Sequence, residues 1–358
     1  MFSEAVQRRS NVRGVLYPCI DYSLYLLSIL AVLYFRSYWI KGFFSVLVLP
    51  ILLSRLFVLG HDLAHRSLAE SKAVNSIFGR LVFIPTWHSF SLWQLLHNVH
   101  HHGYTNIRSA DYSWAPLSPG EFRMLSTPRR LLYRIERTVY GHGVWVLIEH
   151  FFSRMLFPRE RDIGKRRAIY TLDSLLVVSF NALQALLLIL TSRWMAQKGL
   201  ANPMDSVTLL LMTLVIPWSV FAWLYGWLIF IQHTAPEIPW YATESPLDFV
   251  DHQKSVTPQW VFPPWFGWLF HFIHVHTAHH VKPRIPAYNL SSAQRELLDE
   301  SPELVTTIPF TFHRYLDTMK KCKLYDFGRR QWCDYDGIPT GPVLDFSRPK
   351  LDPPIDGK

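Results

Sequence analysis

The chain has 358 residues, of which 49% are hydrophobic and 18% are charged, and its formal net charge is +9. The apolar content excludes a disordered chain, and the charged fraction lies below the roughly 25% of a soluble globular domain. The basic residues are scattered around apolar runs, which argues against nucleic-acid binding and favours a membrane surface. Three cysteines are too few for a disulfide framework and match no zinc-ribbon spacing.

Four hydrophobic stretches are long enough to cross the hydrocarbon core of a bilayer, which is about 30 Å thick. They cover residues 15–35, 40–60, 174–191 and 206–231. Each is expected to form one transmembrane helix. The pattern predicts an all-α integral membrane protein in which residues 1–358 form a single domain.

Two segments outside these stretches are predicted to lie at the membrane interface. Residues 74–96 and 261–275 mix Trp, Phe and Ile with polar residues, and we expect both to form helices at the membrane interface. The tail from Tyr325 onward carries Gly, Pro and Asp in quick succession and is predicted to be irregular.

Basic residues beside the hydrophobic stretches predict the topology. Arg8, Arg9 and Arg13 precede the first stretch, and five more basic residues precede the third: Arg159, Arg161, Lys165, Arg166 and Arg167. The positive-inside rule then places the N-terminus, residues 61–173 and residues 232–358 in the cytoplasm.

Three five-residue segments contain eight of the 17 histidines. They are HDLAH (His61 and His65), HNVHH (His97, His100 and His101) and HTAHH (His276, His279 and His280). At 100° per residue in a regular helix, the histidines within each segment share one face. By the same arithmetic, we expect the neighbouring His102, His271 and His274 to face away.

The predicted topology brings all three segments to the same side of the membrane, so the eight rings can meet. Neutral imidazole is the commonest metal ligand, and a single zinc takes three or four protein ligands. Eight histidines therefore favour two metal ions. No HExxH zinc-protease motif occurs, and a metal transporter would need ligands near the bilayer midplane. A metal-binding membrane protein without redox chemistry remains an open alternative.

The boxes HxxxH, HxxHH and HxxHH, with this hydrophobic spacing, resemble the membrane fatty acid desaturase family over residues 51–290. The contexts HNVHHHGYTN, FIQHTAPEIPWY and HVHTAHHVKPRIPAY are similar to the bacterial acyl-lipid delta-12 branch. The resemblance implies a cytoplasmic helical cap with a di-iron centre, in a bacterial inner-membrane protein with both termini cytoplasmic.

The resemblance also implies the site residues. The eight box histidines are the expected catalytic residues, and with His233 of the QHT segment they are the expected iron ligands: His61, His65, His97, His100, His101, His233, His276, His279 and His280. We expect carboxylates to orient these rings, with Asp62, Asp111 and Glu237 as candidates.

The implied reaction is an O₂-dependent oxidation of a fatty acyl chain by two Fe ions, with desaturation to a C=C bond expected first. Decarboxylation to a terminal alkene, hydroxylation and ketone formation remain alternatives, and the substrate is a lipid, a thioester or a free acid. The aromatic stretches 84–96 and 260–272 are predicted to line an apolar tunnel.

The electrons for this reaction are expected to come from outside the chain. No GxGxxG motif, cysteine run or haem domain is present to collect them. The sequence therefore predicts a ferredoxin-like donor with its reductase, which docks on the basic face.

Overall fold

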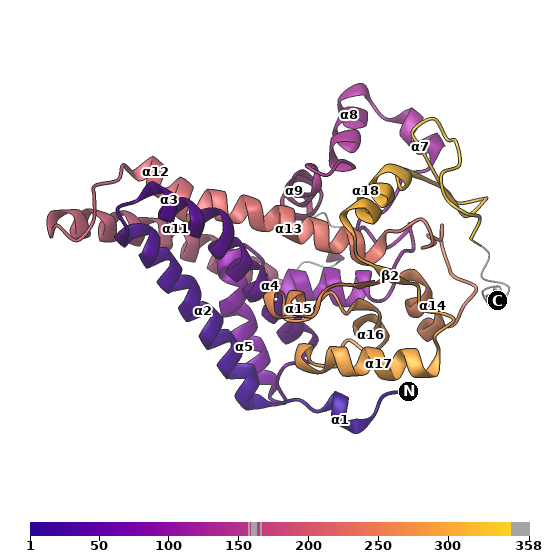
Figure 1. Ribbon diagram of the computed structural model, residues 1–358, viewed down its shortest axis with the longest axis horizontal. Coiled ribbons are helices and arrows are strands. Elements are labelled where there is room, and N and C mark those ends of the chain that lie inside the picture. The colour runs from indigo at the N-terminus through magenta and orange to yellow at the C-terminus, as the bar shows by residue number, and fades with distance from the viewer. Residues whose placement is uncertain (157, 159–162, 165–166, 345–358) are drawn as a thin grey trace, which may run out of the picture.

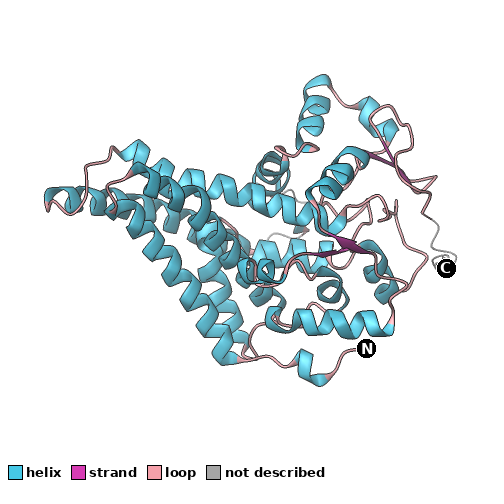
Figure 2. Ribbon diagram, viewed as in Figure 1, coloured by secondary structure: helices cyan, strands magenta, loops and turns pink. Residues whose placement is uncertain are grey.

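The computed structural model describes residues 1–344 except for 157, 159–162 and 165–166, and nearly all of its regular structure is helical (Figures 1 and 2). The α-helices are α1 (Glu4–Gln7), α2 (Asn11–Tyr34), α3 (Tyr38–Phe43), α4 (Leu49–His65), α5 (Lys72–Phe83), α6 (Phe90–Trp93), α7 (Pro119–Met124), α8 (Thr127–Glu136), α9 (His142–Trp145), α11 (Ala168–Gln197), α12 (Ser206–Leu210), α13 (Ile216–His233), α14 (Phe249–Val256), α15 (Pro264–Leu269), α16 (His276–Val281), α17 (Leu290–Glu300) and α18 (Phe312–Lys321).

Shorter 3₁₀ and π segments and four short strands complete the fold. The π-helical segments are η1 (Phe44–Val48), η3 (Gln94–His101), η4 (Val146–Leu156) and η5 (Leu211–Val215), and the 3₁₀ segments are η2 (Ile84–Thr86) and η6 (Ala287–Asn289). Strand β1 (Gln259–Val261) pairs in parallel with β2 (Thr307–Pro309), and β3 (Leu324–Asp326) pairs antiparallel with β4 (Gln331–Cys333).

Four helical segments are long and apolar enough to cross a membrane, which confirms the predicted number. They are Asn11–Tyr34, Tyr38–His65, Ala168–Gln197 and Ser206–His233. The second and fourth continue beyond the hydrophobic stretches and end on histidines. In Figure 1 these helices extend away from a cap that contains both ends of the described chain. The membrane helices thus carry histidines directly into the base of the cap.

The sidedness of the protein remains a prediction. Four of the basic residues that led to it, Arg159, Arg161, Lys165 and Arg166, lie outside the described residues.

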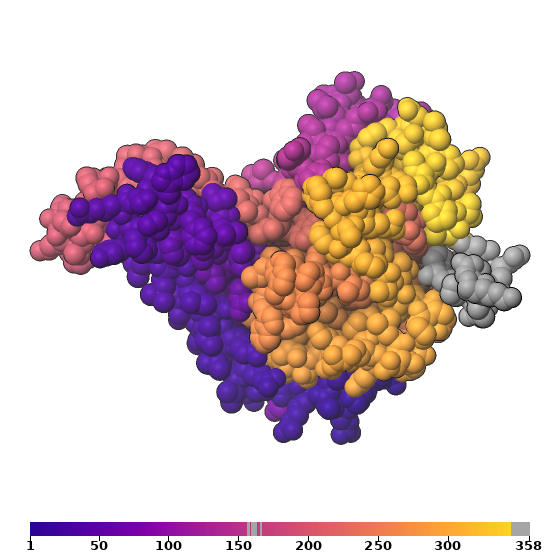
Figure 3. Space-filling model, viewed as in Figure 1, coloured from indigo at the N-terminus to yellow at the C-terminus, as the bar shows by residue number. Residues whose placement is uncertain are grey.

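The cap is formed mainly by the C-terminal segments, which cover the end of the molecule opposite the tips of the membrane helices (Figure 3). Its chain is more broken than predicted. Residues 74–96 divide into α5, η2, α6 and the start of η3, and residues 261–275 contain only one α-helix, the six-residue α15. Prolines at 85 and 263 fit this interruption, because proline cannot continue an α-helical hydrogen-bond ladder.

The prediction of an irregular tail is only partly right for its described residues, because two short strands interrupt the turns. Strands β3 and β4 form a hairpin in which Tyr325 and Trp332 are fully buried, and the Trp332 indole N–H donates to the Ile238 carbonyl at 3.0 Å. Burial of these aromatic side chains stabilises the hairpin, although the segment is rich in residues that favour turns. Residues 345–358 lie outside the described part.

A charged network joins two membrane helices to the cap. Asp21 on α2 accepts hydrogen bonds from Arg55 Nε and Nη2 on α4, at 3.0 and 2.9 Å. Its other oxygen lies 2.5 Å from His271 Nε2, and Arg55 also donates to the Trp268 carbonyl. His271 and the next residue, Phe272, have left-handed φ values of 45° and 60°. The network therefore fixes the strained turn that leads into α16.

Close contact between α13 and α9 depends on Gly226. A Cβ atom at this position would lie 2.4 Å from the His142 carbonyl oxygen. The backbone of α9 or α13 would have to move to relieve this clash. We expect Gly226→Ala to destabilise the protein by about 1–3 kcal/mol, as overpacked substitutions do. Gly42→Ala is the matched control, because no atom lies within 4 Å of its added Cβ. Thermal unfolding in detergent tests this, and equal midpoints for the two variants would contradict it.

Candidate metal centre

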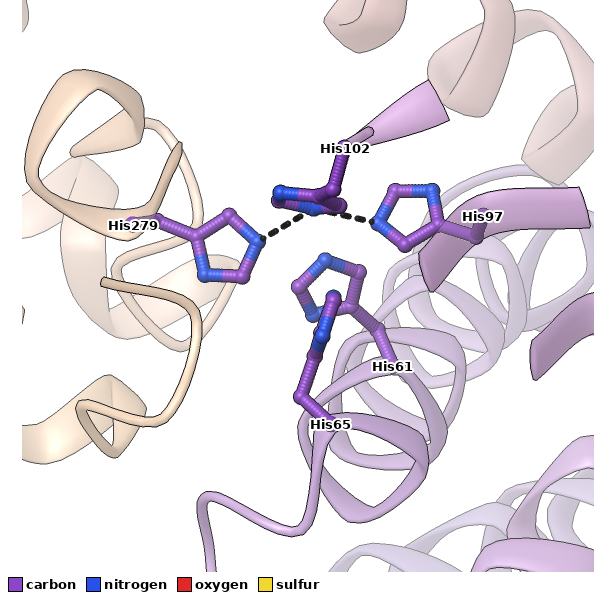
Figure 4. Close-up of side chains that lie close together, drawn as sticks. All are labelled: His61, His65, His97, His102 and His279. Atoms are coloured by element: carbon purple, nitrogen blue, oxygen red, sulfur yellow. Dashed lines mark hydrogen bonds between the residues drawn. The ribbon is translucent and has the colours of Figure 1, made fainter. Parts of the chain in front are cut away.

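Nine histidine side chains converge into two adjacent groups. Within each group the candidate ligand nitrogens all lie within 4.8 Å of one another. The first group contains His61, His65, His97, His102 and His279 (Figure 4), and the second contains His101, His233, His276 and His280. The groups are neighbours, since the rings of His102 and His280 stack with their centroids 4.1 Å apart.

The membrane helices supply three of these rings. His61 and His65 lie one turn apart at the end of α4, with ring centroids separated by 4.7 Å. His233 is the last residue of α13, and its Nε2 lies 2.9 Å from His276 Nε2. A histidine outside the three boxes thus points into the same site as the boxes.

The second box differs from the prediction because it is not a regular α-helix. Its segment, η3, is a π-helix, and the His102 N–H donates to the His97 carbonyl five residues earlier at 2.9 Å. The wider turn places His97 and His102 on the same face, with their Nε2 atoms 3.0 Å apart. The expectation that His102 faces away is therefore wrong.

His100 shows the opposite error. The structure places it in neither histidine group, and its side chain instead lines a polar cleft with Asp111 and Tyr112. The effective spacing of the second box is His97, His101 and His102, because one extra residue is accommodated in the π turn.

The third box follows the regular-helix prediction. His276, His279 and His280 on α16 all enter the site, and His279 Nε2 lies 3.2 Å from His102 Nε2. His271 and His274 belong to neither group, as expected. The His271 ring binds Asp21, and the His274 ring packs against Phe266 at 5.3 Å between centroids.

Carboxylates contact the outer nitrogens of two rings. His101 Nδ1 lies 3.1 Å from both oxygens of Asp111, and His61 Nδ1 lies 3.1 Å from Asp62 Oδ1. Asp62 Oδ2 also accepts the Ala287 N–H at 2.8 Å. Such partners fix the orientation and tautomer of an imidazole and leave its other nitrogen for a metal.

The third carboxylate candidate, Glu237, does not have this role. It forms an ion pair with Arg314 at 2.5 Å instead. An acceptor that sequence reasoning missed is Gln253 on α14, whose Oε1 lies 2.9 Å from His280 Nδ1. No motif marks this glutamine, and only the packing of α14 on α16 reveals it.

The donor set fits metal ions. The Nε2 atoms of His61, His65 and His280 are buried and have no hydrogen-bond partner among the described residues. In three other pairs of rings within the groups, the two Nε2 atoms lie 2.9–3.2 Å apart. Two nitrogens at about 2.1 Å from one ion and at right angles are about 3.0 Å apart, so this spacing suits shared coordination.

The protonation state of the rings fits as well. Burial, with a smaller contribution from neighbouring histidines, holds the pKa of five imidazoles outside the membrane helices well below the usual range. These are His97, His102, His276, His279 and His280. Neutral imidazoles carry the lone pair that a metal requires.

We expect Asp111→Asn to lower metal affinity or turnover by about 10–100-fold, because its oxygens orient His101. Asp299→Asn, on the exposed face of α17, is the matched control. Metal content per chain and turnover should be measured on both purified variants. Wild-type values for Asp111→Asn would show that His101 needs no carboxylate partner.

An apolar cavity lies between the two membrane helices that end on histidines. Its wall includes Phe57 and Val58 from α4 and Phe221, Tyr225 and Leu228 from α13. The end of the cavity nearest the cap is lined by rings of both groups, among them His61, His97, His101, His233 and His276.

The cavity extends into the membrane-spanning part of the molecule. It reaches Ser54, seven residues before His61 on α4, which is about 10 Å along the helix axis. The predicted tunnel walls are largely wrong, since residues 84–96 contribute only Trp93 and residues 260–272 contribute nothing. The lining suits an apolar group that lies beside the histidines.

Comparisons with known proteins agree with this geometry. The family model described as fatty acid desaturase matches residues 37–312. The sn-1 oleoyl-lipid 12-desaturase of Synechocystis is 30% identical over 76% of this chain and 73% of the relative, and that of Picosynechococcus is 28% identical over 76% and 74%. The chloroplastic omega-6 fatty acid desaturase of Glycine max is 28% identical over 77% of this chain and 61% of its own length. This chain, with its four membrane helices and two histidine groups, belongs to the fatty acid desaturase family.

Proposed function

We propose that the protein is an O₂-dependent di-iron desaturase that introduces a C=C bond into the acyl chain of a membrane lipid. The observation that carries the proposal is the apolar cavity between α4 and α13, which ends on both histidine groups. The names of the relatives support the substrate class, because two of them are oleoyl-lipid 12-desaturases.

In this proposal each histidine group holds one iron ion. The first would be held by His61, His65, His97, His102 and His279, and the second by His101, His233, His276 and His280. Bound iron supplies the O₂-dependent redox chemistry that removal of hydrogen from an unactivated methylene requires.

The protein itself positions the substrate. Phe57, Trp93 and Tyr225 surround the acyl chain next to the histidines and exclude water from it. A straight chain has no polar group at the reacting carbons, so the walls must fix which carbons lie beside the rings. A displacement of about 1 Å is enough to change such a reaction strongly.

We propose further that the active site and both termini face the cytoplasm of a bacterial inner membrane. The net charge of +9 supports docking of an acidic electron carrier of the ferredoxin type, with its reductase. Positive patches accelerate such encounters and make them sensitive to salt.

The test uses the purified full-length protein. We expect about two irons per chain and, with O₂, reduced ferredoxin and an oleoyl lipid, a product with one additional internal double bond and unchanged chain length. A terminal alkene one carbon shorter would indicate the decarboxylase, and an added hydroxyl the hydroxylase. One zinc per chain without iron would contradict the metal assignment.

A further inference from the structure

A second, polar cleft lies directly beside the apolar cavity. It has a volume of about 760 Å³ and is bounded by the chain after η3, by α8 and by η4. Two residues, Tyr112 and Trp145, line both the cleft and the apolar cavity. The two spaces therefore adjoin at these aromatic side chains.

Tyr112 is in contact with both spaces. Its ring stacks with that of His150, which lines the apolar cavity, at 6.2 Å between centroids. The Arg154 guanidinium, which lines the polar cleft, lies 4.3 Å from the centroid of the same ring. A molecule with a polar head and an apolar chain could cross from one space to the other at this ring.

The cleft is rich in arginine. Four arginines line it, together with three carboxylates: Arg108, Arg129, Arg137 and Arg154, and Asp111, Glu136 and Glu149. Asp111 is already engaged by His101, and Glu149 forms an ion pair with Arg129. The guanidinium of Arg137 donates to the carbonyls of Trp114 and Ala115. Arg108 also forms an ion pair, with Glu121 at 3.3 Å. Arg137 is buried and forms no ion pair among the described residues, so its charge favours an anionic ligand, and arginine suits the geometry of phosphate.

Glu136 favours a ligand that also carries a hydrogen-bond donor. Only 3% of this residue is exposed, and its Oε1 has no hydrogen-bond partner among the described residues. Burial, and next the nearby Glu149, raise the pKa of Glu136 to about 7. A buried acceptor without a donor is unfavourable, so a ligand that brings a donor to this oxygen would be bound more tightly.

We propose that the cleft binds the head of a glycerophospholipid substrate, with the phosphate among the arginines and a hydroxyl or amine of the head donating to Glu136. The acyl chain then passes Tyr112 and Trp145 into the apolar cavity. This proposal rests on the proposed function and names the head-group chemistry of the same substrate. A fixed head determines which carbons of the chain lie beside the histidine groups.

The first test compares lipids with identical oleoyl chains, using the full-length iron-loaded enzyme in detergent micelles. Phosphatidylethanolamine and phosphatidylglycerol each offer a phosphate and a donor. Phosphatidylcholine has the phosphate without the donor, and a galactolipid has hydroxyl donors without the phosphate. We expect KM to be about 10-fold higher or more for the last two, the loss expected for one hydrogen bond to a charged group. Equal or preferred use of the galactolipid, or of oleoyl-CoA, would overturn the proposal.

The second test uses variants of the cleft. Glu136→Met removes the acceptor, so KM for phosphatidylethanolamine and phosphatidylglycerol should rise about 10-fold, to the level of phosphatidylcholine. KM for phosphatidylcholine should not change, which controls for folding within the same protein. Glu136→Gln keeps an acceptor oxygen and should retain most binding of phosphatidylglycerol. Arg129→Gln should weaken all three phospholipids alike.

Matched controls lie on the surface outside the cleft: Arg123→Gln and Glu244→Gln. Neither should change KM for any lipid. If Glu136→Met changed KM for all lipids equally, or for none, Glu136 would have no role in head-group recognition.

Binding separates this proposal from the proposed function. Native mass spectrometry of the same preparation measures retention of each lipid without turnover. Head-selective retention without any new double bond would contradict the desaturase and keep the cleft assignment. Desaturation with equal retention of all heads would contradict the cleft assignment and keep the desaturase.

Discussion

His102→Ala is expected to abolish desaturation, whereas His100→Ala is expected to leave most of it. His102 Nε2 lies 3.0 Å from His97 Nε2 and 3.2 Å from His279 Nε2, at the middle of the first histidine group (Figure 4). His100 belongs to neither group. Loss of residues that merely orient a metal ligand lowers affinity or activity by about 10–100-fold, so loss of a ligand should have at least that effect.

Iron per chain and turnover should be measured together on both variants. We expect His102→Ala to lose iron and at least about 100-fold in turnover, and His100→Ala to keep wild-type iron with turnover within several-fold. A His100→Ala protein without iron and a normal His102→Ala protein would show that the second box is a regular helix in the metal-loaded enzyme.

The second large effect is expected at Asp21, far from the histidine boxes in sequence. Asp21 is 1% exposed and binds both Arg55 and His271. Asp21→Leu leaves the Arg55 guanidinium without its carboxylate inside the membrane part of the protein. Removing one member of a buried ion pair is destabilising by about 3–5 kcal/mol, because the remaining charge is uncompensated.

A double variant distinguishes lost charge pairing from lost packing. Replacing both Asp21 and Arg55 by leucine removes the unpaired charge, and apolar replacement of a whole pair is often neutral. Asp21→Leu should therefore lower the midpoint of thermal unfolding sharply, and Asp21→Leu with Arg55→Leu should recover much of the loss. If the double variant were no more stable than the single one, the unpaired guanidinium would not be the cause.

The membrane helices could be predicted from sequence because their signal is composition over some 20 residues. Hydropathy misplaced only their ends, since the second and fourth helices continue through polar histidines to His65 and His233. Those extra turns are stabilised by packing within the cap, which hydropathy does not measure.

The histidine site could be predicted in part. Helical-wheel arithmetic agrees with the structure for α4 and α16, which are regular α-helices. It fails in η3, because a π turn changes the angle between successive residues and exchanges His100 for His102. A helical wheel assumes i→i+4 hydrogen bonds throughout, so it does not anticipate the i→i+5 bonds of a π turn.

Contacts between distant segments were not accessible from sequence. Glu237 pairs with Arg314, 77 residues later, and His280 contacts Gln253 on another helix. The walls of the cavity come from α4 and α13 because their apolar faces meet below the histidines. An aromatic-rich stretch alone does not reveal which of its side chains face such a space.

The position of α16 late in the chain governs when the site can exist during synthesis. His233 and His276, which touch in the second histidine group, are 43 residues apart. At about 5–20 residues per second, the ribosome needs about 2–9 s to make that stretch. Throughout this interval the second group has two of its four rings, His101 and His233, and the first lacks His279. A nascent chain therefore offers only partial sites, and a metal can be bound by both complete histidine groups only after α16 has been synthesised.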